Sequence, residues 1–321
     1  MKGKSLAAYG GLGLLIIFLM LSWQLFDLHL LVEQLRGMLA EPGWLFFMFV
    51  VYLLSFVLKA AAWQAYAGRE HPFGLYLHGI FYSLLVNHLL PIKAGDFVRA
   101  GLLMKKARMR WDTALHSVVM MRLTDLFVLG TIAAAGMLGL GMAVSWYTIA
   151  GAAAAALILG AALKLMPIRR WPFVSRHAEQ FKAVAISRQG PYIFALVAAS
   201  WVLEAVILYG IARMADIRLG AAASIWANSV TIGGQLFHVT PGGIGTYEST
   251  MSGTLALLGV DWEKAYATAL LAHAFKFAVS FLVGAYSLLR MPIGLQEARG
   301  WLRMPRKSDL QTNQTSERIF K

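Results

Sequence analysis

Long apolar runs separated by short charged segments form the main pattern of this 321-residue chain. A run of about 17–25 apolar residues is long enough to cross a bilayer as an α-helix. The pattern therefore predicts an all-α polytopic membrane protein with about six full spans. The predicted spans are Leu6–Phe26, Trp44–Ala62, Ala114–Leu140, Tyr147–Leu165, Tyr192–Ile211 and Ala265–Leu289.

Two further apolar stretches, near 75–104 and 221–260, are interrupted by proline and glycine. The interruptions lie at Pro91 and Gly95 in the first stretch, and at Pro241, Gly242, Gly243 and Gly245 in the second. Backbone that leaves a helix at membrane depth is tolerated only where protein or a water-filled cavity supplies its hydrogen bonds. Such breaks in corresponding positions of two halves indicate the central site of a transporter.

The charges of the loops predict how these broken stretches sit in the membrane. Segments 93–110 and 164–190 carry six bases each and segment 290–307 carries five, whereas 27–43 is mainly acidic. Basic loops prefer the cytoplasmic side. With a cytoplasmic N-terminus, all of them lie there only if both broken stretches are re-entrant hairpins, the first entering from the cytoplasm and the second from outside. Eight full spans are the alternative, which would place some basic loops outside.

The re-entrant interpretation makes the chain an inverted-topology repeat. Each half then runs in the order span, span, hairpin, span, and the two halves have opposite orientations. The predicted halves are 1–142 and 143–290, followed by a polar cytoplasmic tail over 291–321. Both termini are expected on the cytoplasmic side of the cell membrane.

Composition excludes several classes of protein. Hydrophobic residues make up 59% of the chain and charged residues 14%, which is not typical of a soluble globular protein. The 29 Lys and Arg against 16 Asp and Glu lie mostly in loops, so they indicate orientation and contact with anionic lipid, and we expect no nucleic-acid partner. The chain has no cysteine, P-loop or His-Glu-x-x-His motif, and we expect no cofactor and no metal.

Ionisable residues within the apolar stretches are the candidate functional residues, because charge in lipid is costly and usually serves a function. Arg122 and Asp125 are three residues apart and share one helix face. They form either a structural ion pair or a phosphate site in which Asp125 orients Arg122. Arg99 closely follows the first break, and Lys276 lies deep in the last span, where it needs a partner or water.

The glycines of the second break permit positive φ angles and a close backbone approach, which fits a helix tip that offers amides to an anion. Glu248 follows this break. We expect it either to pair with Arg or Lys across the repeat interface or to accept a cationic head group.

Several other polar residues have simpler interpretations. Asn87, His88 and His238 flank the breaks, where they can bond freed backbone groups. Lys59 is expected to extend to the inner membrane surface, and Glu204 is a candidate second acid. The remaining apolar-segment histidines are interpreted as packing or interfacial residues: His78, His116 and His273.

Three motifs, in order, cover most of residues 6–290. Asn-x-x-x-Pro-x-x-x-Gly-Asp-x-x-Arg spans 87–99, Arg-x-x-Asp spans 122–125, and Pro-Gly-Gly-x-Gly-x-x-Glu spans 241–248. This combination resembles the transmembrane flippase domain of lysylphosphatidylglycerol synthase/flippases. The resemblance implies a protein that moves lipids, such as aminoacylated phosphatidylglycerol, between leaflets, a process linked to antimicrobial peptide resistance.

In full-length relatives a soluble C-terminal domain transfers lysine from lysyl-tRNA to phosphatidylglycerol. This chain ends some thirty residues after its last predicted span. We therefore expect a stand-alone member without lysyltransferase activity. Polyprenyl-phosphate carriers are a rival cargo.

The leading hypothesis is a lipid transporter with a polar cavity where the two breaks meet. Arg99, Arg122 and Lys276, with Asn87 beside them, would hold the phosphate of a phospholipid or lipid-linked phosphate. The acids Asp96, Asp125 and Glu248 would balance those bases or engage a head-group amine. The alternatives are a lipid-phosphate transferase with Glu248 or Asp125 as general base, and a scaffold for envelope enzymes. The sequence leaves open whether the chain forms a homo-oligomer.

Overall fold

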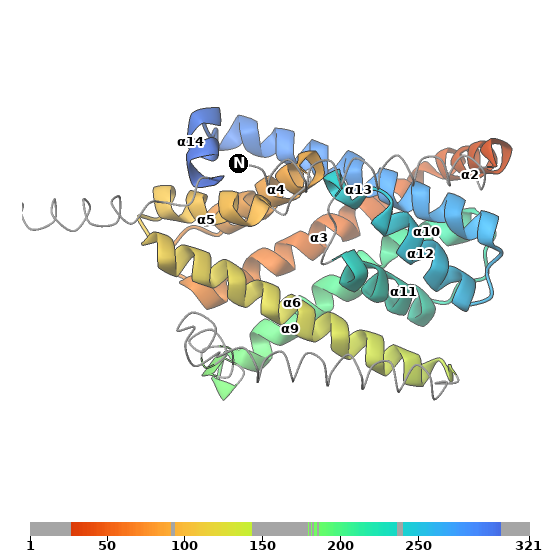
Figure 1. Ribbon diagram of the computed structural model, residues 1–321, viewed down its shortest axis with the longest axis horizontal. Coiled ribbons are helices and arrows are strands. Elements are labelled where there is room, and N and C mark those ends of the chain that lie inside the picture. Colours follow the sequence, from red (N-terminus) through yellow and green to blue (C-terminus); the bar gives the residue numbers. More distant parts are fainter. Residues whose placement is uncertain are drawn as a thin grey trace, which may run out of the picture.

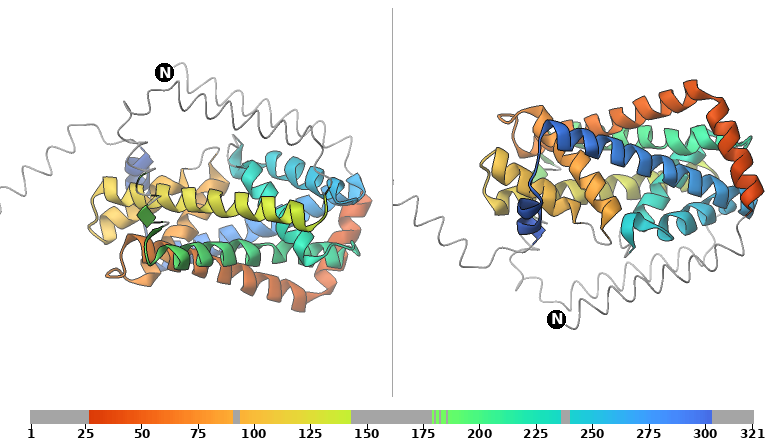
Figure 2. Two further views of the ribbon diagram at one scale, coloured as in Figure 1. Left: turned by 90° about the horizontal axis from the view of Figure 1, so that it is seen from below. Right: turned by 90° about the horizontal axis from the view of Figure 1, so that it is seen from above.

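The computed structural model describes residues 27–90, 94–142, 186–235 and 240–302, and the single positions 179, 181, 183 and 184. Every regular element in these residues is helical. Most of the helices lie roughly along one direction, as Figures 1 and 2 show. The predicted spans Leu6–Phe26 and Tyr147–Leu165 lie outside the described residues, as do Pro91 and His238.

Four long apolar helices form the body of the described part. They are α3 (Pro42–Ala67), α6 (Trp111–Gly139), α9 (Gly190–Glu204) continued by α10 (Val206–Met214), and α13 (Trp262–Arg290). Each is long and apolar enough to cross a membrane. Four of the six predicted spans therefore correspond to helices that could cross a membrane, with ends shifted by at most five residues. An all-α multi-pass membrane protein is confirmed.

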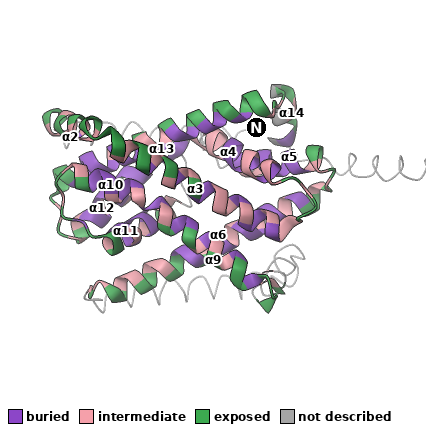
Figure 3. Cartoon of the chain, turned by 180° about the vertical axis from the view of Figure 1, so that it is seen from behind, coloured by how far each residue is buried: buried purple, intermediate pink, exposed green. Residues whose placement is uncertain are grey.

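The outer faces of these helices are apolar. Phe46, Phe47, Val50 and Leu54 are exposed on α3, and exposed and buried residues alternate along α13 (Figure 3). Large apolar side chains that face outward from a helical bundle are suited to lipid contact. Inside the bundle, buried residues from all the long helices form one apolar cluster.

Each broken stretch forms a helical hairpin. The first consists of α4 (Phe73–Leu89) and α5 (Gly95–Lys106), and the second of α11 (Ala221–Gly234), the 3₁₀ turn η3 (Pro241–Gly243) and α12 (Thr246–Leu257). At about 1.5 Å per residue, these arms are roughly 18–26 Å long, shorter than the ~30 Å hydrocarbon core. The hairpins come from opposite ends of the bundle and turn near its middle (Figure 1). There α4 contacts η3.

Asn87 and Gly95 close the first hairpin. The Gly95 N–H donates to Asn87 Oδ1 at 2.9 Å, so a side chain of α4 satisfies a free amide at the start of α5. A Cβ atom at position 95 would collide with the backbone carbonyl oxygen of Ser83. The motif therefore allows the two arms to approach closely.

The glycines of the second break allow the chain to change direction. Gly242, Gly243 and Gly245 have φ angles of 63°, 79° and 89°, a region that favours glycine. Gly245 precedes α12, and its N–H donates to Glu248 Oε2 at 2.7 Å. Glu248 thus caps its own helix by reaching back to the break.

Two short helices occur where none is predicted. Helix α2 (Leu28–Ala40) occupies the acidic segment interpreted as a loop, and the Leu30 N–H donates to its N-cap Asp27 at 3.0 Å. Helix α14 (Leu295–Leu302) lies within the segment predicted as a polar tail from residue 291. Trp301 of α14 is buried against Gly101 of α5, at one end of the bundle (Figure 2). Both helices are too short and polar for a hydropathy pattern to show.

Candidate functional site

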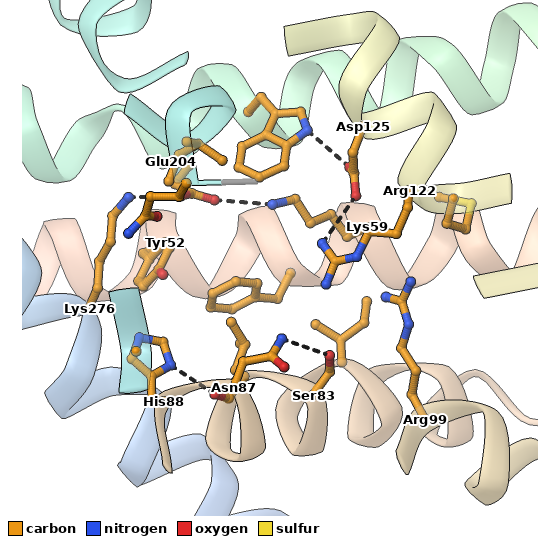
Figure 4. A pocket seen from close by; sticks show the side chains of 18 of the residues that line it. Tyr52, Lys59, Ser83, Asn87, His88, Arg99, Arg122, Asp125, Glu204 and Lys276 are labelled. Carbon is orange, nitrogen blue, oxygen red and sulfur yellow. Dashed lines mark hydrogen bonds and ion pairs between the residues drawn. The ribbon is translucent and has the colours of Figure 1, made fainter. Parts of the chain in front are cut away.

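A polar cavity lies between the two hairpins and the long helices (Figure 4). It provides about 170 Å³ of space for water-sized molecules. Its wall includes the aromatic residues Tyr52, Phe56, Trp63, Trp201 and Tyr247. The charged and polar lining side chains are Lys59, Ser83, Asn87, His88, Arg99, Arg122, Asp125, Glu204, Gln235, His273 and Lys276.

Most of the predicted site residues meet in this cavity. Asn87, Arg99, Arg122, Asp125 and Lys276 come from four helices and all line it, and Gly242 of the second break lines it too. Two predicted acids, Asp96 and Glu248, stand behind the lining and bond to residues that form it. Long apolar helices could be assigned from the sequence, but this convergence depends on how they pack.

Arg122 is held mainly by Asp96, which projects from α5. Its Nε lies 2.9 Å from Asp96 Oδ2 and its Nη2 lies 2.9 Å from Oδ1, a two-pronged contact. The predicted pair with Asp125 on the same helix is present but longer, at 3.7 Å. Asp96 lies on α5 and Arg122 on the neighbouring α6, so Asp96 can present both carboxylate oxygens to the guanidinium, whereas Asp125 lies on the same helix as Arg122. Arg122 is half-buried, with 33% of its side chain exposed.

Arg99 is buried beside this pair. Its Nη2 donates to the Val118 carbonyl at 3.3 Å, and its guanidinium carbon lies 5.0 Å from the Trp63 ring centroid. Its Nε lies 3.5 Å from Asp96 Oδ1 but has no hydrogen-bond acceptor. Asp96 therefore balances two guanidinium groups at once.

A second charged cluster surrounds Glu204. Its Oε1 lies 2.9 Å from Lys276 Nζ and its Oε2 lies 3.1 Å from Lys59 Nζ, and Lys276 also donates to Asn228 Oδ1 at 3.1 Å. The expectation that Lys59 reaches the membrane surface is wrong, because Glu204 attracts it inward. Lys276 has the partner that its depth requires. The sequence showed only that these charged residues lie in apolar segments. Which of them pair with one another is seen only in the folded structure.

Trp201 joins the two clusters. Its indole N–H donates to Asp125 Oδ1 at 3.0 Å, and Lys59 Nζ lies 3.2 Å from its ring centroid. The cation–π contact and the hydrogen bond use different parts of one indole. The lining thus forms a continuous charged network from Arg122 to Lys276 (Figure 4).

Glu248 does not make the predicted pair with Arg or Lys. Its Oε1 instead lies 2.6 Å from His273 Nδ1, while its Oε2 accepts the Gly245 N–H. His273 is interpreted from sequence as a packing residue, but it also reaches the Gly242 carbonyl, 3.1 Å from Nε2. Its ring stacks on Tyr247, with centroids 4.2 Å apart. Glu248 and His273 together hold the second break against α13.

Metal binding would need several close ligands. Among the described residues, no group of three His, Cys, Asp or Glu side chains could share a metal ion. The chemistry that the lining offers is ion pairing and hydrogen bonding, with donors in excess.

Two similarities to known proteins add to this geometry. Glycosyltransferase AglD of Haloferax volcanii is 24% identical over 315 aligned residues, which cover 81% of this chain and 50% of that protein. The chain therefore spans about half the length of this relative. Residues 10–284 match the family described as the lysylphosphatidylglycerol synthase TM region. Because this match covers most of the chain, the protein belongs to the lysylphosphatidylglycerol synthase transmembrane-region family.

Proposed function

We propose that this protein moves a lipid with a phosphate-bearing head group between the two leaflets of the cell membrane. The observation that carries the proposal is the cavity where two opposed hairpins meet. Its four lining bases, Lys59, Arg99, Arg122 and Lys276, are bonded to three carboxylates, those of Asp96, Asp125 and Glu204. Because Glu248 pairs with His273, these four bases exceed the three carboxylates bonded to them by one positive charge, which an anion would neutralise.

In this proposal the head group enters the cavity while its hydrocarbon tails stay in the bilayer. Arg122 makes the first contact, because it is the most open of the four bases. Arg99 and Lys276 hold the phosphate deeper inside, and Asn87 keeps the first break in place. Asp96 and Asp125 orient the guanidinium groups, and Glu248 acts through His273 on the second break.

Alternating access would come from rocking one half of the chain against the other. The described helices α3 to α6 and α9 to α13 follow the same order of long helix, hairpin and long helix, with the hairpins at opposite ends (Figure 1). This order supports an inverted repeat with halves 1–142 and 143–290 and a site between them.

The distribution of charge supports cytoplasmic termini. One end of the bundle carries the C-terminal ends of α5 and α13, where the bases include Lys105, Lys106, Arg108, Arg110 and Arg290 and outnumber acids such as Asp112 and Glu297. The other end carries α2 and the start of α13, where the acids Asp27, Glu33, Glu41, Asp261 and Glu263 outnumber the bases Arg36 and Lys264. The basic end would face the cytoplasm.

A membrane-embedded transferase is a second candidate, favoured by the name of the Haloferax volcanii relative. In that case Asp125 or Glu248 would act as general base on a lipid phosphate. The transferase would form a new product from purified protein and lipid, whereas a transporter leaves its cargo chemically unchanged. A scaffold for envelope enzymes would do neither.

Lipid translocation in proteoliposomes tests the proposal. The purified chain would be supplied with labelled lysyl-phosphatidylglycerol, phosphatidylglycerol and polyprenyl phosphate, with and without ion gradients. We expect Arg122→Ala to lower the rate roughly ten- to a hundredfold, the value of a charge-assisted hydrogen bond. Gly130→Ala is the matched control on the same helix, because nothing lies within 4 Å of its added Cβ.

Product analysis of the same samples separates the remaining cases. Movement of a lipid that Arg122→Ala abolishes in folded protein supports transport through this cavity. Wild-type rates in that variant would remove Arg122 from the proposed site. If no lipid moves, the transport proposal fails, and a new lipid product would then favour the transferase.

A further inference from the structure

We infer that the cavity selects lipids whose head group carries phosphate and no amine, and that it discriminates against aminoacylated lipids. The inference rests on the proposed function and names its cargo class. Phosphatidylglycerol and polyprenyl phosphate share the required chemistry, whereas lysyl-phosphatidylglycerol does not.

The carboxylates at the cavity are already occupied by the protein's own cations and donors. Asp96 contacts Arg122 with both oxygens. Asp125 accepts the indole N–H of Trp201 on Oδ1 and faces Arg122 with Oδ2. Glu204 receives one lysine on each oxygen. A head-group ammonium would have to displace one of these cations to find a negative partner.

Glu248 offers no spare carboxylate either. One of its oxygens accepts the Gly245 N–H and the other bonds His273, and it is buried behind the lining. Asp96, Asp125 and Glu248 are the acids expected from sequence to engage a head-group amine. None of them therefore has a carboxylate in the cavity that is free of protein partners.

The segments that lie outside the described residues and before the tail contain no further acid that could approach the cavity. Segments 1–26, 91–93, 143–178 and 236–239, and positions 180, 182 and 185, contain neither Asp nor Glu. Beyond the described residues the acids are Asp309 and Glu317, both in the last 19 residues. The same segments contain several Lys and Arg, so any charge that they add near the cavity is positive.

Three buried groups in or beside the cavity wall have an unused hydrogen-bond donor. They are the Nε of Arg99 and the hydroxyl of Tyr247, which line the cavity, and the Nδ2 of Asn228, a residue whose Oδ1 bonds the lining residue Lys276; none of the three has a hydrogen-bond partner among the described atoms. Buried polar groups without partners call for an explanation. Phosphate oxygens accept hydrogen bonds, whereas an ammonium group only donates them. The extra positive charge of the four bases therefore favours a phosphate over an ammonium group.

The test compares three lipids that differ stepwise at the head group, in proteoliposomes containing the full chain. Phosphatidylglycerol is anionic and small, and lysyl-phosphatidylglycerol carries two added amines. The third is lysyl-phosphatidylglycerol with both amines acetylated, which keeps the added bulk but removes the added charge. We expect phosphatidylglycerol and the acetylated lipid to move at least about tenfold faster than lysyl-phosphatidylglycerol.

The outcomes distinguish this inference from the proposed function. Equal or faster movement of lysyl-phosphatidylglycerol overturns the amine discrimination and leaves transport intact. Slow movement of both bulky lipids shows selection by size and also overturns it. Movement of no lipid overturns the proposed function together with the inference.

A variant that changes cavity charge provides a second test. Arg122→Gln frees Asp96 from its main partner, so the ratio of lysyl-phosphatidylglycerol to phosphatidylglycerol transport should rise. Arg122→Lys keeps the charge and should leave that ratio low. An unchanged ratio in folded Arg122→Gln protein would contradict a selection set by charge.

Discussion

His273 bonds the carboxylate of Glu248 and the backbone carbonyl of Gly242 with its two ring nitrogens, at 2.6 and 3.1 Å. A carbonyl only accepts, so Nε2 must carry a proton. Nδ1 then either donates to an ionised Glu248 or accepts from a protonated one. In both cases Glu248 and His273 share one proton. Through its two hydrogen bonds, His273 ties α13 to the second break.

Glu248→Gln should preserve this arrangement without the shared proton. The new amide can donate to Nδ1 of a neutral imidazole while its oxygen accepts the Gly245 N–H. We expect a stability close to wild type, whereas Glu248→Ala leaves these groups unpaired and costs about 1–3 kcal/mol. Thermal unfolding in detergent compares the two.

Equal losses in Gln and Ala variants would contradict this hydrogen-bond assignment. A stable Glu248→Gln protein also separates structure from transport. If it translocates lipid normally, the carboxyl group serves only to hold the break. If it does not, the shared proton takes part in transport.

Glu204→Gln should be among the most destabilising single changes in the cavity. It leaves Lys59 and Lys276 close together without a negative partner, and breaking a buried ion pair in this way costs roughly 3–5 kcal/mol. Lys59→Met leaves Glu204 with Lys276 and should cost less. Thermal unfolding of the variants tests the order, and a larger loss in Lys59→Met would refute it.

Gly95→Ala should loosen the first hairpin. Its Cβ would collide with the backbone oxygen of Ser83, which cannot rotate away. We expect a loss of about 1–3 kcal/mol, as for an overpacked core. Gly130→Ala, with open space at its Cβ, should have an unfolding temperature at or above that of wild type. Similar stabilities for the two variants would argue against close packing of α4 and α5.

Both ends of each hairpin should react from the same side of the membrane. The cysteine-free chain allows single-cysteine variants at Gly74 and Lys106 for the first hairpin, and at Gly220 and Asp261 for the second. A membrane-impermeant maleimide should label the first pair from one face and the second pair from the other. Labelling of Gly74→Cys and Lys106→Cys from opposite faces would instead support full spans.

The contact of α14 with α5 should depend on pH. Lys105 bonds Glu297, and this hydrogen bond, with one from the Gly294 N–H, lowers the pKa of Glu297. A lowered pKa favours the docked state above the ordinary glutamate value of about 4.3, and this contribution disappears as pH falls through the folded-state value. A nitroxide on Gly300→Cys should become more mobile over that range.

Glu297→Gln is the control for that titration. It should show greater mobility at neutral pH and little change on acidification. An identical pH response in Glu297→Gln would place the titrating group elsewhere. Because the pair is solvent-exposed, we expect a small effect on overall stability.

Much of the site could be predicted from residues whose presence in an apolar stretch is itself unusual. Arg122, Asp125 and Lys276 stand out because charge at membrane depth requires compensation. Asn87, Gly95 and Gly242 stand out because broken helices need backbone partners and close approach. In the structure all of these residues except Gly95 line one cavity.

The partners of these residues could not be predicted. Glu204 bonds Lys276 across 72 positions and Lys59 across 145, and Asp96 bonds Arg122 across 26. Such pairs depend on the rotation and depth of each helix, which local sequence does not encode. Helix α14 was missed for a related reason, since its docking depends on Trp301 meeting Gly101.

The sequence by itself determined that this is a helical membrane protein with two interrupted helices. The thickness of the bilayer sets the length of each apolar run, and a backbone that leaves a helix at that depth needs glycine, proline and polar partners. Only the tertiary structure decided that three carboxylates are taken up by four bases, and that His273 rather than a lysine or arginine bonds Glu248. Ion pairs form between side chains that packing brings within a few ångströms, and packing is a property of the whole bundle.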